Sequence, residues 1–390
     1  MCERKIKVLY DDGGFLMPHG GVPRYFTEVI KRLPAYVEWK LGMVGTSNCY
    51  LMSPPFNIPP HQQTVNDFIK EYLHGHSFRG VSHVYRILAR LMPIKFPSGE
   101  LANKRRFKKE CLKGDFDILH ITHPHPVDRY WKNIVGKKPI VATVHDLIPE
   151  MMQANRIVAK CRMQMLHDAT KVIAVSENTK KDIIRLYGIE EDKIKVIHHG
   201  YLSDRQTNII NEAPNKPYIL YVGKRKGYKN FDFFVGAIAS LLIERDMILF
   251  CTGSAFSDEE MGLIEKYGIA DRVINRFVSD GEMSSLFKNA VAFVYPSLYE
   301  GFGIPILDAF NAGCPVVLSR CSCFPEVAGD AALYFDKGDG LSLCEHIERV
   351  FDDKVVRNQM IERGKNRVLK YSWENCAEAT AYLYEEAMAE

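Results

Sequence analysis

Apolar residues recur along this chain in two successive series of short runs, and an amphipathic or polar stretch follows each run. The runs are rich in Val, Ile, Tyr and Phe, which is typical of strands, whereas a stretch such as 23–33 has helical spacing. Strands that alternate with helices predict a parallel sheet with crossover helices. The predicted strands are 7–10, 118–122, 140–143, 172–175 and 195–198, and then 218–222, 247–252, 273–277, 292–295, 315–318 and 333–335.

The series starts again after Gly200, which predicts two Rossmann-like α/β domains with a cleft between them in a chain of 390 residues. We predict a first domain over 1–202 and a second over 203–372. The stretch 203–217 is rich in Asn and is interpreted as the linker. The tail, 373–390, is helical by composition and has no strand after it, which predicts a helix crossing back toward the first domain.

Composition excludes several classes of protein. The chain opens with charged residues that lead directly into a strand, and its apolar runs are too short to span a membrane, so neither an export signal nor a membrane helix is expected. The ten cysteines are scattered without a CxxC pair, which favours a reduced cytoplasmic protein over a zinc or disulfide framework. Basic residues are in excess over the first 200 residues and acidic residues over the remainder, so the first half is expected to face an acidic partner.

Residues 78–113 combine many basic residues with apolar residues at helical spacing. A basic amphipathic helix can lie on an anionic membrane surface, and its apolar stripe can equally face the core of its own domain. Both interpretations stay open for this segment. No recognisable nucleic-acid-binding module surrounds it, so nucleic acid is not an expected partner.

The run 295–310 carries the most informative chemistry. A strand ends in a polar turn, Glu300 is followed by Gly-Phe-Gly, and Pro305 stands where a first helical turn tolerates proline. Free backbone N–H groups and a positive dipole end would then lie beside a carboxylate, which suits a phosphorylated sugar. Asp308 follows eight residues after Glu300, about two helical turns on, which predicts that both acids lie on one face. A capped helix with a solvated Asp308 is the structural alternative.

A second cluster, 221–230, directly follows a predicted strand and contains Gly223, Arg225 and Lys229. Glycine lets the backbone turn close to a ligand, and Arg with Lys supply the planar fork and the point charge that a diphosphate needs. The alternative is an ordinary basic surface loop, but the cluster lies in the acidic half of the chain. We therefore interpret it as a phosphate site.

Two features of the first half have the same character. Gly20 and Gly21 lie between the first strand and its helix and permit close approach of a sugar or phosphate to the helix N-terminus. His145 follows the strand 140–143, and a side chain at the carboxyl end of a strand in an open α/β sheet points into the crevice. A lone His is more often structural, so this position is a weak signal by itself.

These motifs resemble those of the family-four retaining glycosyltransferases with the GT-B fold. The run 295–310 is similar to the family's E-x7-E signature, with Asp308 one methylene short in the second place, and is followed as in the family by Gly313-Cys314-Pro315 and Pro325-Glu326-Val327. In that family the first acid contacts the transferred sugar and the second binds the nucleotide ribose. The resemblance spans nearly the whole chain and is loosest over 50–113, where acceptor recognition usually varies.

The resemblance implies that the donor lies between the domains and that the first domain binds the acceptor. It assigns catalytic roles to Glu300, His145, Arg225 and Lys229, the last two on the donor diphosphate and His145 near the reacting carbon. The implied donor-binding residues are Gly20, Gly21, Gly223, Arg225, Lys229, Gly253, Val278, Glu300, Gly301, Phe302, Gly303, Ile304 and Asp308, with Val278 in the nucleobase pocket.

The implied reaction is retaining transfer of a hexose from a GDP- or UDP-linked sugar, with GDP-mannose favoured. The acceptor is a glycan or a lipid-linked glycan of a surface polysaccharide such as lipopolysaccharide, and the enzyme would be cytoplasmic or peripheral on the inner face of the membrane. No acid is obviously placed as a nucleophile, so same-face attack is expected. No metal or other cofactor is expected, because Arg225 and Lys229 neutralise the diphosphate, and Asp11-Asp12 is interpreted as a turn.

Two other functions stay open. A GT-B-fold nucleotide-sugar epimerase would need an additional acid/base pair in the cleft, which the sequence does not reveal. A non-catalytic subunit that kept the fold would not need the intact Glu300, Arg225 and Lys229. A nicotinamide dehydrogenase is disfavoured because no GxGxxG follows the first strand.

Overall fold

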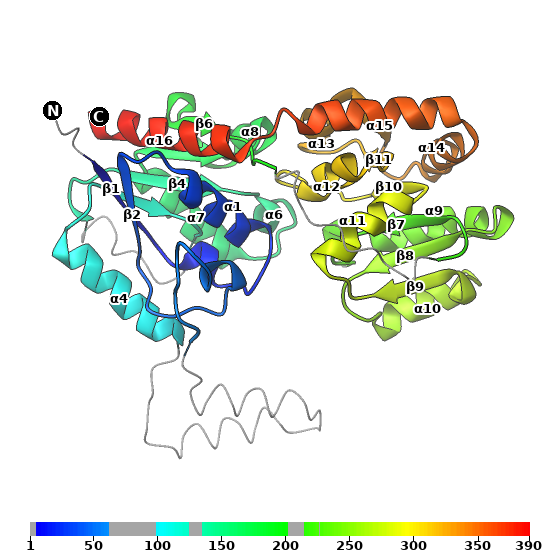
Figure 1. Cartoon of the computed structure of the whole chain (residues 1–390), viewed down its shortest axis with the longest axis horizontal. Helices are drawn as coiled ribbons and strands as arrows, with labels where there is room; N and C mark the ends of the chain where they lie inside the picture. Colours follow the sequence, from blue (N-terminus) through cyan, green and yellow to red (C-terminus); the bar gives the residue numbers. More distant parts are fainter. Residues whose placement is uncertain (1–4, 62–98, 125–134, 202–213, 226) are drawn as a thin grey trace, which may run out of the picture.

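Two lobes lie side by side, and each contains one six-stranded sheet in which all neighbouring strands are parallel (Figure 1). This arrangement confirms the predicted α/β class with two Rossmann-like domains. The predicted boundary at residues 202 and 203 lies outside the described residues. The computed structural model of the chain describes residues 5–61, 99–124, 135–201, 214–225 and 227–390.

The N-terminal lobe has the sheet order β2-β1-β3-β4-β5-β6. Its described elements are β1 (Ile6–Tyr10), α1 (Gly21–Arg32), β2 (Val37–Leu41), α4 (Gly99–Lys113), β3 (Ile118–Ile121), β4 (Ile140–Val144), α6 (Ile148–Met151), α7 (Arg156–Asp168), β5 (Lys171–Ala174), α8 (Glu177–Tyr187) and β6 (Ile194–Val196).

The C-terminal lobe has the sheet order β12-β11-β10-β7-β8-β9. Its elements are β7 (Tyr218–Tyr221), α9 (Phe231–Glu244), β8 (Ile248–Thr252), α10 (Asp258–Lys266), β9 (Val273–Arg276), α11 (Asp280–Asn289), β10 (Ala292–Tyr295), α12 (Ile304–Ala312), β11 (Val316–Ser319), α13 (Phe324–Ala328), β12 (Leu333–Phe335), α14 (Gly340–Asp352) and α15 (Lys354–Val368), after which α16 (Trp373–Ala389) follows.

The central strands are buried on both faces, which explains why continuous apolar runs predicted them. Every residue of β3, β4, β7, β8, β10 and β11 is buried. The strand that the sequence analysis missed, β2, is at the edge of its sheet and has the mixed sequence Val-Glu-Trp-Lys-Leu, of which only the two end residues are buried. An edge strand leaves one side to solvent and therefore tolerates polar residues.

Each sheet has a point where the chain changes direction of travel across it. In the N-terminal sheet this point lies between β1 and β3, and in the C-terminal sheet between β7 and β10. Loops at the carboxyl ends of two such strands leave toward opposite faces, so a crevice opens between them and receives ligands. The segments that follow β7 and β10 are 222–230 and 296–303, the two regions in which the sequence places its phosphate and sugar motifs.

The last helix, α16, returns to the N-terminal lobe (Figure 1). The hydroxyl of Tyr384 is hydrogen-bonded to the hydroxyl of Tyr10 and to Nδ1 of His120, at 2.6 Å in each case, and Nε2 of His120 lies 2.8 Å from the Thr143 hydroxyl. This buried network connects α16 to β1, β3 and β4. Because unpaired polar groups in a core are costly, the network fixes where the helix docks.

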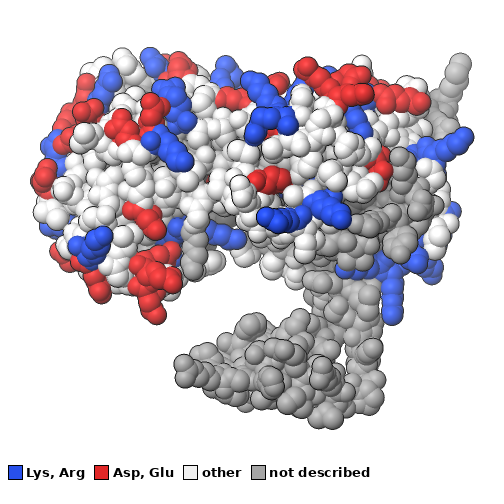
Figure 2. Space-filling view, turned by 180° about the vertical axis from the view of Figure 1, so that it is seen from behind, with Lys and Arg blue, Asp and Glu red and all other residues white. Residues whose placement is uncertain are grey.

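The described surface is mixed in charge. On the face seen in Figure 2, acidic and basic side chains are interspersed over the described residues. A nucleic-acid interface is usually a continuous basic patch or stripe, which that face does not present. Among the described helices, none is both long enough and apolar enough to cross a bilayer.

Candidate active site

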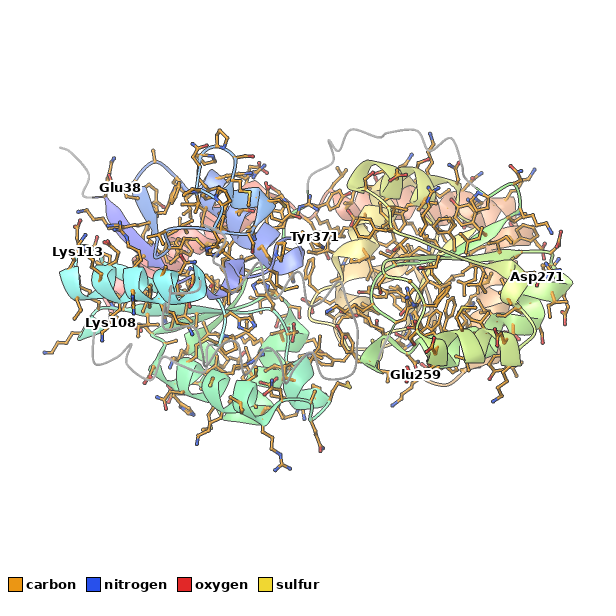
Figure 3. All side chains as sticks on the ribbon, turned by 90° about the horizontal axis from the view of Figure 1, so that it is seen from below. Glu38, Lys108, Lys113, Glu259, Asp271 and Tyr371 are labelled. Atoms are coloured by element: carbon orange, nitrogen blue, oxygen red, sulfur yellow. The ribbon has the colours of Figure 1, made fainter. Side chains whose placement is uncertain are left out.

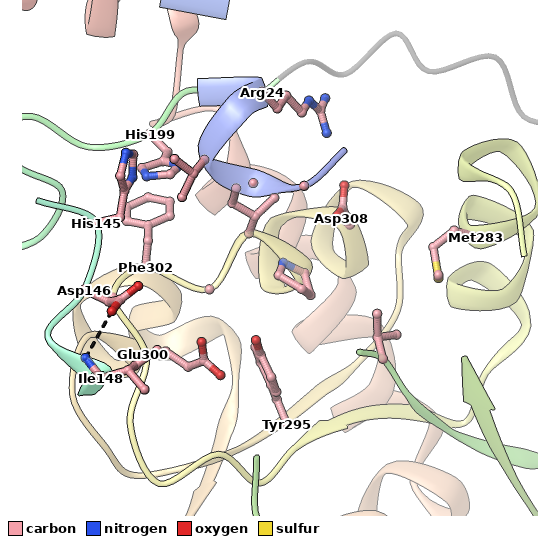
Figure 4. A pocket seen from close by; sticks show the side chains of 18 of the residues that line it. Arg24, His145, Asp146, Ile148, His199, Met283, Tyr295, Glu300, Phe302 and Asp308 are labelled. Carbon is pink, nitrogen blue, oxygen red and sulfur yellow. Dashed lines mark hydrogen bonds between the residues drawn. The ribbon is translucent and has the colours of Figure 1, made fainter. Parts of the chain in front are cut away.

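A cavity of about 410 Å³ opens between the lobes, where the first turns of α1 and α12 meet (Figure 4). The N-terminal lobe supplies residues that follow β1, β4 and β6, and the C-terminal lobe supplies residues that follow β7 and β10. The cavity is lined by Gly20, Gly21, Val22, Arg24, Tyr50, His145, Asp146, Ile148, His199, Val222, Tyr228, Met283, Phe287, Tyr295, Glu300, Gly301, Phe302, Gly303, Ile304, Pro305 and Asp308.

Two helix N-termini converge on this cavity. The residues that precede α1 and α12 are Gly20 and Gly303, with positive φ angles of 134° and 92° and without a side-chain cap. A Cβ added to Gly21 would lie 3.3 Å from Cδ1 of Ile304, so the two helix starts approach closely across the lobe boundary. First-turn N–H groups have no partner within their helix, and the helix dipole is positive at this end. Both lobes therefore present positive potential to the same space, which favours an anion.

Glu300 lies on the cavity wall beside a single cation. Its Oε1 accepts a hydrogen bond of 2.6 Å from Nζ of Lys229, and the same Nζ donates to the Tyr295 hydroxyl at 2.9 Å. The side chains of Lys229 and Glu300 are only 12% and 10% exposed, so little water screens this ion pair. Lys229 and Glu300 meet because β7 and β10 are neighbours at the switch point. The carboxylate is thus placed in the cavity with its charge already balanced.

Two histidines with buried ring nitrogens, His145 and His199, stand opposite Glu300 in the lining. Neither ring nitrogen of either side chain has a hydrogen-bond partner among the described residues. Burial, reinforced by His199, holds the pKa of His145 well below its ordinary value of 6.5, and burial lowers the pKa of His199 to about 3. Both rings are therefore neutral at pH 7. His199 stacks on Phe302 with ring centroids 4.7 Å apart, whereas His145 can hydrogen-bond a ligand without adding charge.

Asp308 also lines the cavity, but not for the reason that its spacing from Glu300 suggested. The helix α12 begins at Ile304, so Glu300 lies in the preceding turn and the two acids do not share a helix face. Asp308 is in the second turn of α12, opposite Arg24 (Figure 4). Burial, together with the nearby Asp308 carboxylate, raises the pKa of Tyr201. The prediction of a common helical face was wrong, although both acids reach the cavity.

Five predicted site residues do not line the cavity: Gly223, Arg225, Lys229, Gly253 and Val278. Lys229 still contacts Glu300, as described above. Val278 packs against the core of the C-terminal lobe. Gly253, with a φ of 116°, lies beside the carbonyl of Gly223, so the loops after β7 and β8 run close together.

Arg225 connects these two loops in the described structure. Its Nη2 donates to the carbonyls of Ser254 and Ala255 at 2.6 and 2.9 Å, and its Nε lies 3.2 Å from a carboxylate oxygen of Glu260. It is 5% exposed and lines a separate cavity of about 400 Å³. The guanidinium would have to leave these partners to reach the interlobe cavity, so its contact with a diphosphate stays a prediction.

The lobes touch through backbone as well as side chains. A Cβ on Gly301 would fall 1.7 Å from the carbonyl oxygen of His145, so only glycine fits where these two backbone segments meet. At a second contact between the lobes, the Glu326 carboxylate accepts from the backbone N–H of Glu177 at 2.8 Å and is hydrogen-bonded to Nε2 of His198 at 2.7 Å. A residue of α13 thus caps the N-terminus of α8 in the other lobe. These contacts hold the cavity walls in register.

Sequence reasoning missed several lining residues. Met283 and Phe287 are four positions apart on α11, which is the spacing of ordinary core residues, so no signal distinguished them. Arg24 left a signal, because a basic residue in the first turns of a helix opposes the helix dipole. Tyr295 ends a predicted strand, and only the tertiary structure shows its hydroxyl against Lys229.

The described residues contain no group of three or more His, Cys, Asp or Glu side chains placed to hold a metal ion. In the pair interpreted as a turn, Asp11 accepts a hydrogen bond of 2.9 Å from the backbone N–H of Thr122 and one from its hydroxyl. Asp11 thus connects the ends of β1 and β3, which is a structural role.

Comparison with known proteins matches both lobes. The family model of the group 1 glycosyl transferases matches residues 203–367, and that of glycosyltransferase family 4 matches residues 61–205. The O-antigen chain mannosyltransferase B of Escherichia coli is 30% identical over 97% of this chain and 99% of its own length. The O-antigen chain mannosyltransferase RfbU of Salmonella typhimurium is 27% identical over 62% of this chain and 71% of its own.

Among solved structures, HepE from Anabaena in complex with UDP and glucose has a TM-score of 0.73 with this chain at 15% sequence identity, over 97% of this chain and 99% of its own. Two parallel sheets with a cavity between them, together with this likeness, define a glycosyltransferase fold of the GT-B type. The chain belongs to the group 1 glycosyltransferases of glycosyltransferase family 4. It is therefore a transferase related to enzymes of O-antigen synthesis.

Proposed function

We propose that this protein is a retaining hexosyltransferase that moves a hexose from a nucleotide-diphosphate sugar to a glycan or lipid-linked acceptor of a surface polysaccharide such as lipopolysaccharide. The observation that carries the proposal is the meeting of two glycine-capped helix N-termini with a lysine-paired glutamate on one cavity. The helix starts suit a diphosphate, and the carboxylate suits the hydroxyl groups of a sugar.

In the proposed complex the diphosphate lies against the first turns of α1 and α12, and the sugar lies between Glu300 and His145. Glu300 accepts hydrogen bonds from sugar hydroxyls while Lys229 balances its charge. A neutral His145 donates or accepts a hydrogen bond near the anomeric carbon. As the bond from that carbon to the phosphate oxygen breaks, negative charge grows on the leaving phosphate, where the helix ends stabilise it.

The acceptor is proposed to enter a second cavity, of about 290 Å³, in the N-terminal lobe. It shares the wall residues Val22, His145, Asp146 and Ile148 with the donor cavity and is also lined by Thr122 and Thr143. An acceptor hydroxyl at the shared wall attacks the anomeric carbon on the face that the phosphate leaves. Its oxygen forms the new glycosidic bond, and its proton passes to the departing phosphate oxygen, so the anomeric configuration is retained without a protein nucleophile.

The donor is proposed to be GDP-mannose, because the relatives from Escherichia coli and Salmonella typhimurium are named mannosyltransferases. A UDP-linked hexose is the alternative, since HepE was crystallised with UDP and glucose. We further propose that transfer needs no metal, because two helix N-termini with positive dipole ends meet at the cavity.

The outer face of α4 supports the proposed contact with an anionic membrane. Its exposed side chains Arg105, Lys108, Lys109 and Leu112 are spaced i, i+3, i+4, i+7 and so form one stripe, which we call the basic face of α4. The opposite side packs Phe107 and Cys111 into the core. Figure 3 shows Lys108 on the side of the lobe that is remote from the C-terminal lobe. The part of the basic segment before residue 99 lies outside the described residues.

The central test replaces Glu300 with Gln. The wild-type protein is incubated with GDP- and UDP-hexoses and an O-antigen-type acceptor, with and without EDTA, and nucleoside diphosphate release and product configuration are measured. We expect a product linkage with the same anomeric configuration as the donor, and activity that survives EDTA. We expect E300Q to lower kcat by about 100-fold or more.

The matched control is Glu265→Gln, the same chemical change at an exposed position of α10, which should leave kcat unchanged. An isomerised donor without transfer would indicate an epimerase. Near-normal turnover of E300Q would overturn the role of Glu300.

A further inference from the structure

Arg24 is the only Lys or Arg among the described residues that line the interlobe cavity. It is the fourth residue of α1, one turn beyond Gly20 and Gly21, and its side chain is half-buried. Figure 4 shows it on the N-terminal wall, facing Asp308 across the cavity. The two cations that the sequence analysis assigned to the diphosphate, Arg225 and Lys229, belong to the C-terminal lobe. Arg24 is a further cation and belongs to the N-terminal lobe.

No ion pair or side-chain hydrogen bond joins Arg24 to another described residue, in contrast to the neighbouring cations. Lys229 is paired with Glu300, and Arg225 is held by Glu260 and two carbonyls. The first turn of α1 contains no acidic residue, so Arg24 adds positive charge to a helix end that is already positive. The helix end and Arg24 together favour an anion at this position.

We propose that Arg24 binds the donor's diphosphate from the N-terminal lobe, on the side of the cavity opposite to Lys229 of the C-terminal lobe. This inference rests on the proposed function. A guanidinium offers two parallel donors to phosphate oxygens, which a helix end alone does not. A nucleotide diphosphate carries more negative charge than two helix ends balance, and Arg24 stands beside both ends. The diphosphate is then held between the lobes, so that donor binding favours the close approach of α1 and α12 seen in the structure.

The test compares the binding of nucleoside diphosphates with that of the matching nucleosides by isothermal titration calorimetry, using GDP with guanosine and UDP with uridine. The variants are Arg24→Gln, Arg24→Lys and the control Arg32→Gln. Arg32 lies on the same helix but is ion-paired with Glu28 and Glu374, away from the cavity. Circular dichroism confirms that each variant is folded.

We expect R24Q to weaken nucleoside diphosphate binding by about tenfold to 100-fold, the loss of one charge-assisted contact, and to change nucleoside binding by less than about twofold. R24K should show a smaller loss because it keeps the charge without the fork. R32Q should bind both ligands as the wild type does. A residue that only supported the fold would weaken both ligands together.

Equal diphosphate affinity in R24Q and wild type, with or without a raised KM for the acceptor, would overturn the assignment of Arg24 while leaving the proposed function intact. Equal losses for nucleoside and diphosphate would overturn it as well. If the wild type bound neither GDP nor UDP, the proposed function would fall, and this inference with it.

Discussion

At the scale of single residues, the contact between Gly301 and the His145 carbonyl is the tightest point of the cavity. Any side chain at residue 301 would require the two lobes to separate, because a Cβ would overlap the carbonyl oxygen at 1.7 Å. We expect Gly301→Ala to lower kcat/KM by about 100-fold or more, since an ångström-scale displacement of reacting groups has effects of that size. Steady-state kinetics with the donor that supports turnover in the activity test measures this loss.

The control for this change is Gly262→Ala on α10, where a Cβ would meet nothing within 4 Å. There the substitution should raise the unfolding free energy by up to about 1 kcal/mol, because alanine favours a helix over glycine. Normal kinetics in G301A would show that the cavity does not depend on close approach of the lobes.

At the scale of elements, α4 has two dissimilar sides, and the basic face is the one available to a partner. Reversing two charges of that face, with Lys108→Glu and Lys109→Glu, should lower binding to vesicles containing anionic lipid by at least about tenfold, at roughly 1 kcal/mol for each basic residue near the surface. Flotation of the protein with vesicles at low and moderate salt measures the bound fraction.

The same reversal on α15, with Lys354→Glu and Lys365→Glu, serves as control because both residues are exposed on the other lobe. Equal binding of the wild type to neutral and anionic vesicles, or an equal loss in the control, would count against the membrane contact of α4.

At the scale of the whole molecule, three histidines whose ring nitrogens are buried make stability depend on pH. Burial lowers the pKa of His120 and of His199 to about 3, and that of His145 well below 6.5. The unfolded chain takes up protons near pH 6.5 that the folded protein excludes, so the unfolding free energy is fully present above that pH and decreases as the pH falls. Each histidine contributes a slope of about 1.4 kcal/mol per pH unit below this point.

Urea unfolding at several pH values between 7.5 and 5 measures this slope, above the range in which carboxylates titrate. The unfolding free energy of His199→Asn should depend less steeply on pH than that of the wild type, because the variant lacks one of the groups that take up a proton on unfolding. An unfolding free energy that stays constant from pH 7 to 5 would contradict the burial of these rings in solution.

The fold was predictable in its main lines because buried parallel strands leave continuous apolar runs, as in β4 and β10, and because the runs occur twice. The edge strand β2 was missed, since its polar residues hide the pattern. The candidate site was predictable where glycine, proline and acid occur in one turn, as at Glu300. Arg24 and Met283 were not recognised as site residues, because each lies on a helix with ordinary spacing and only the packing of the lobes brings its side chain to the cavity.

The sequence by itself determined the two α/β lobes, the family and the turns that hold Glu300, Lys229 and His145, because these depend on local residue pattern. Only the tertiary structure decided which side chains share a cavity. The order of the strands brings Lys229 to Glu300, the approach of the lobes sets Gly301 against His145, and packing turns Arg225 toward Glu260. Such contacts between distant parts of the chain are set by packing and charge pairing, which local patterns do not encode.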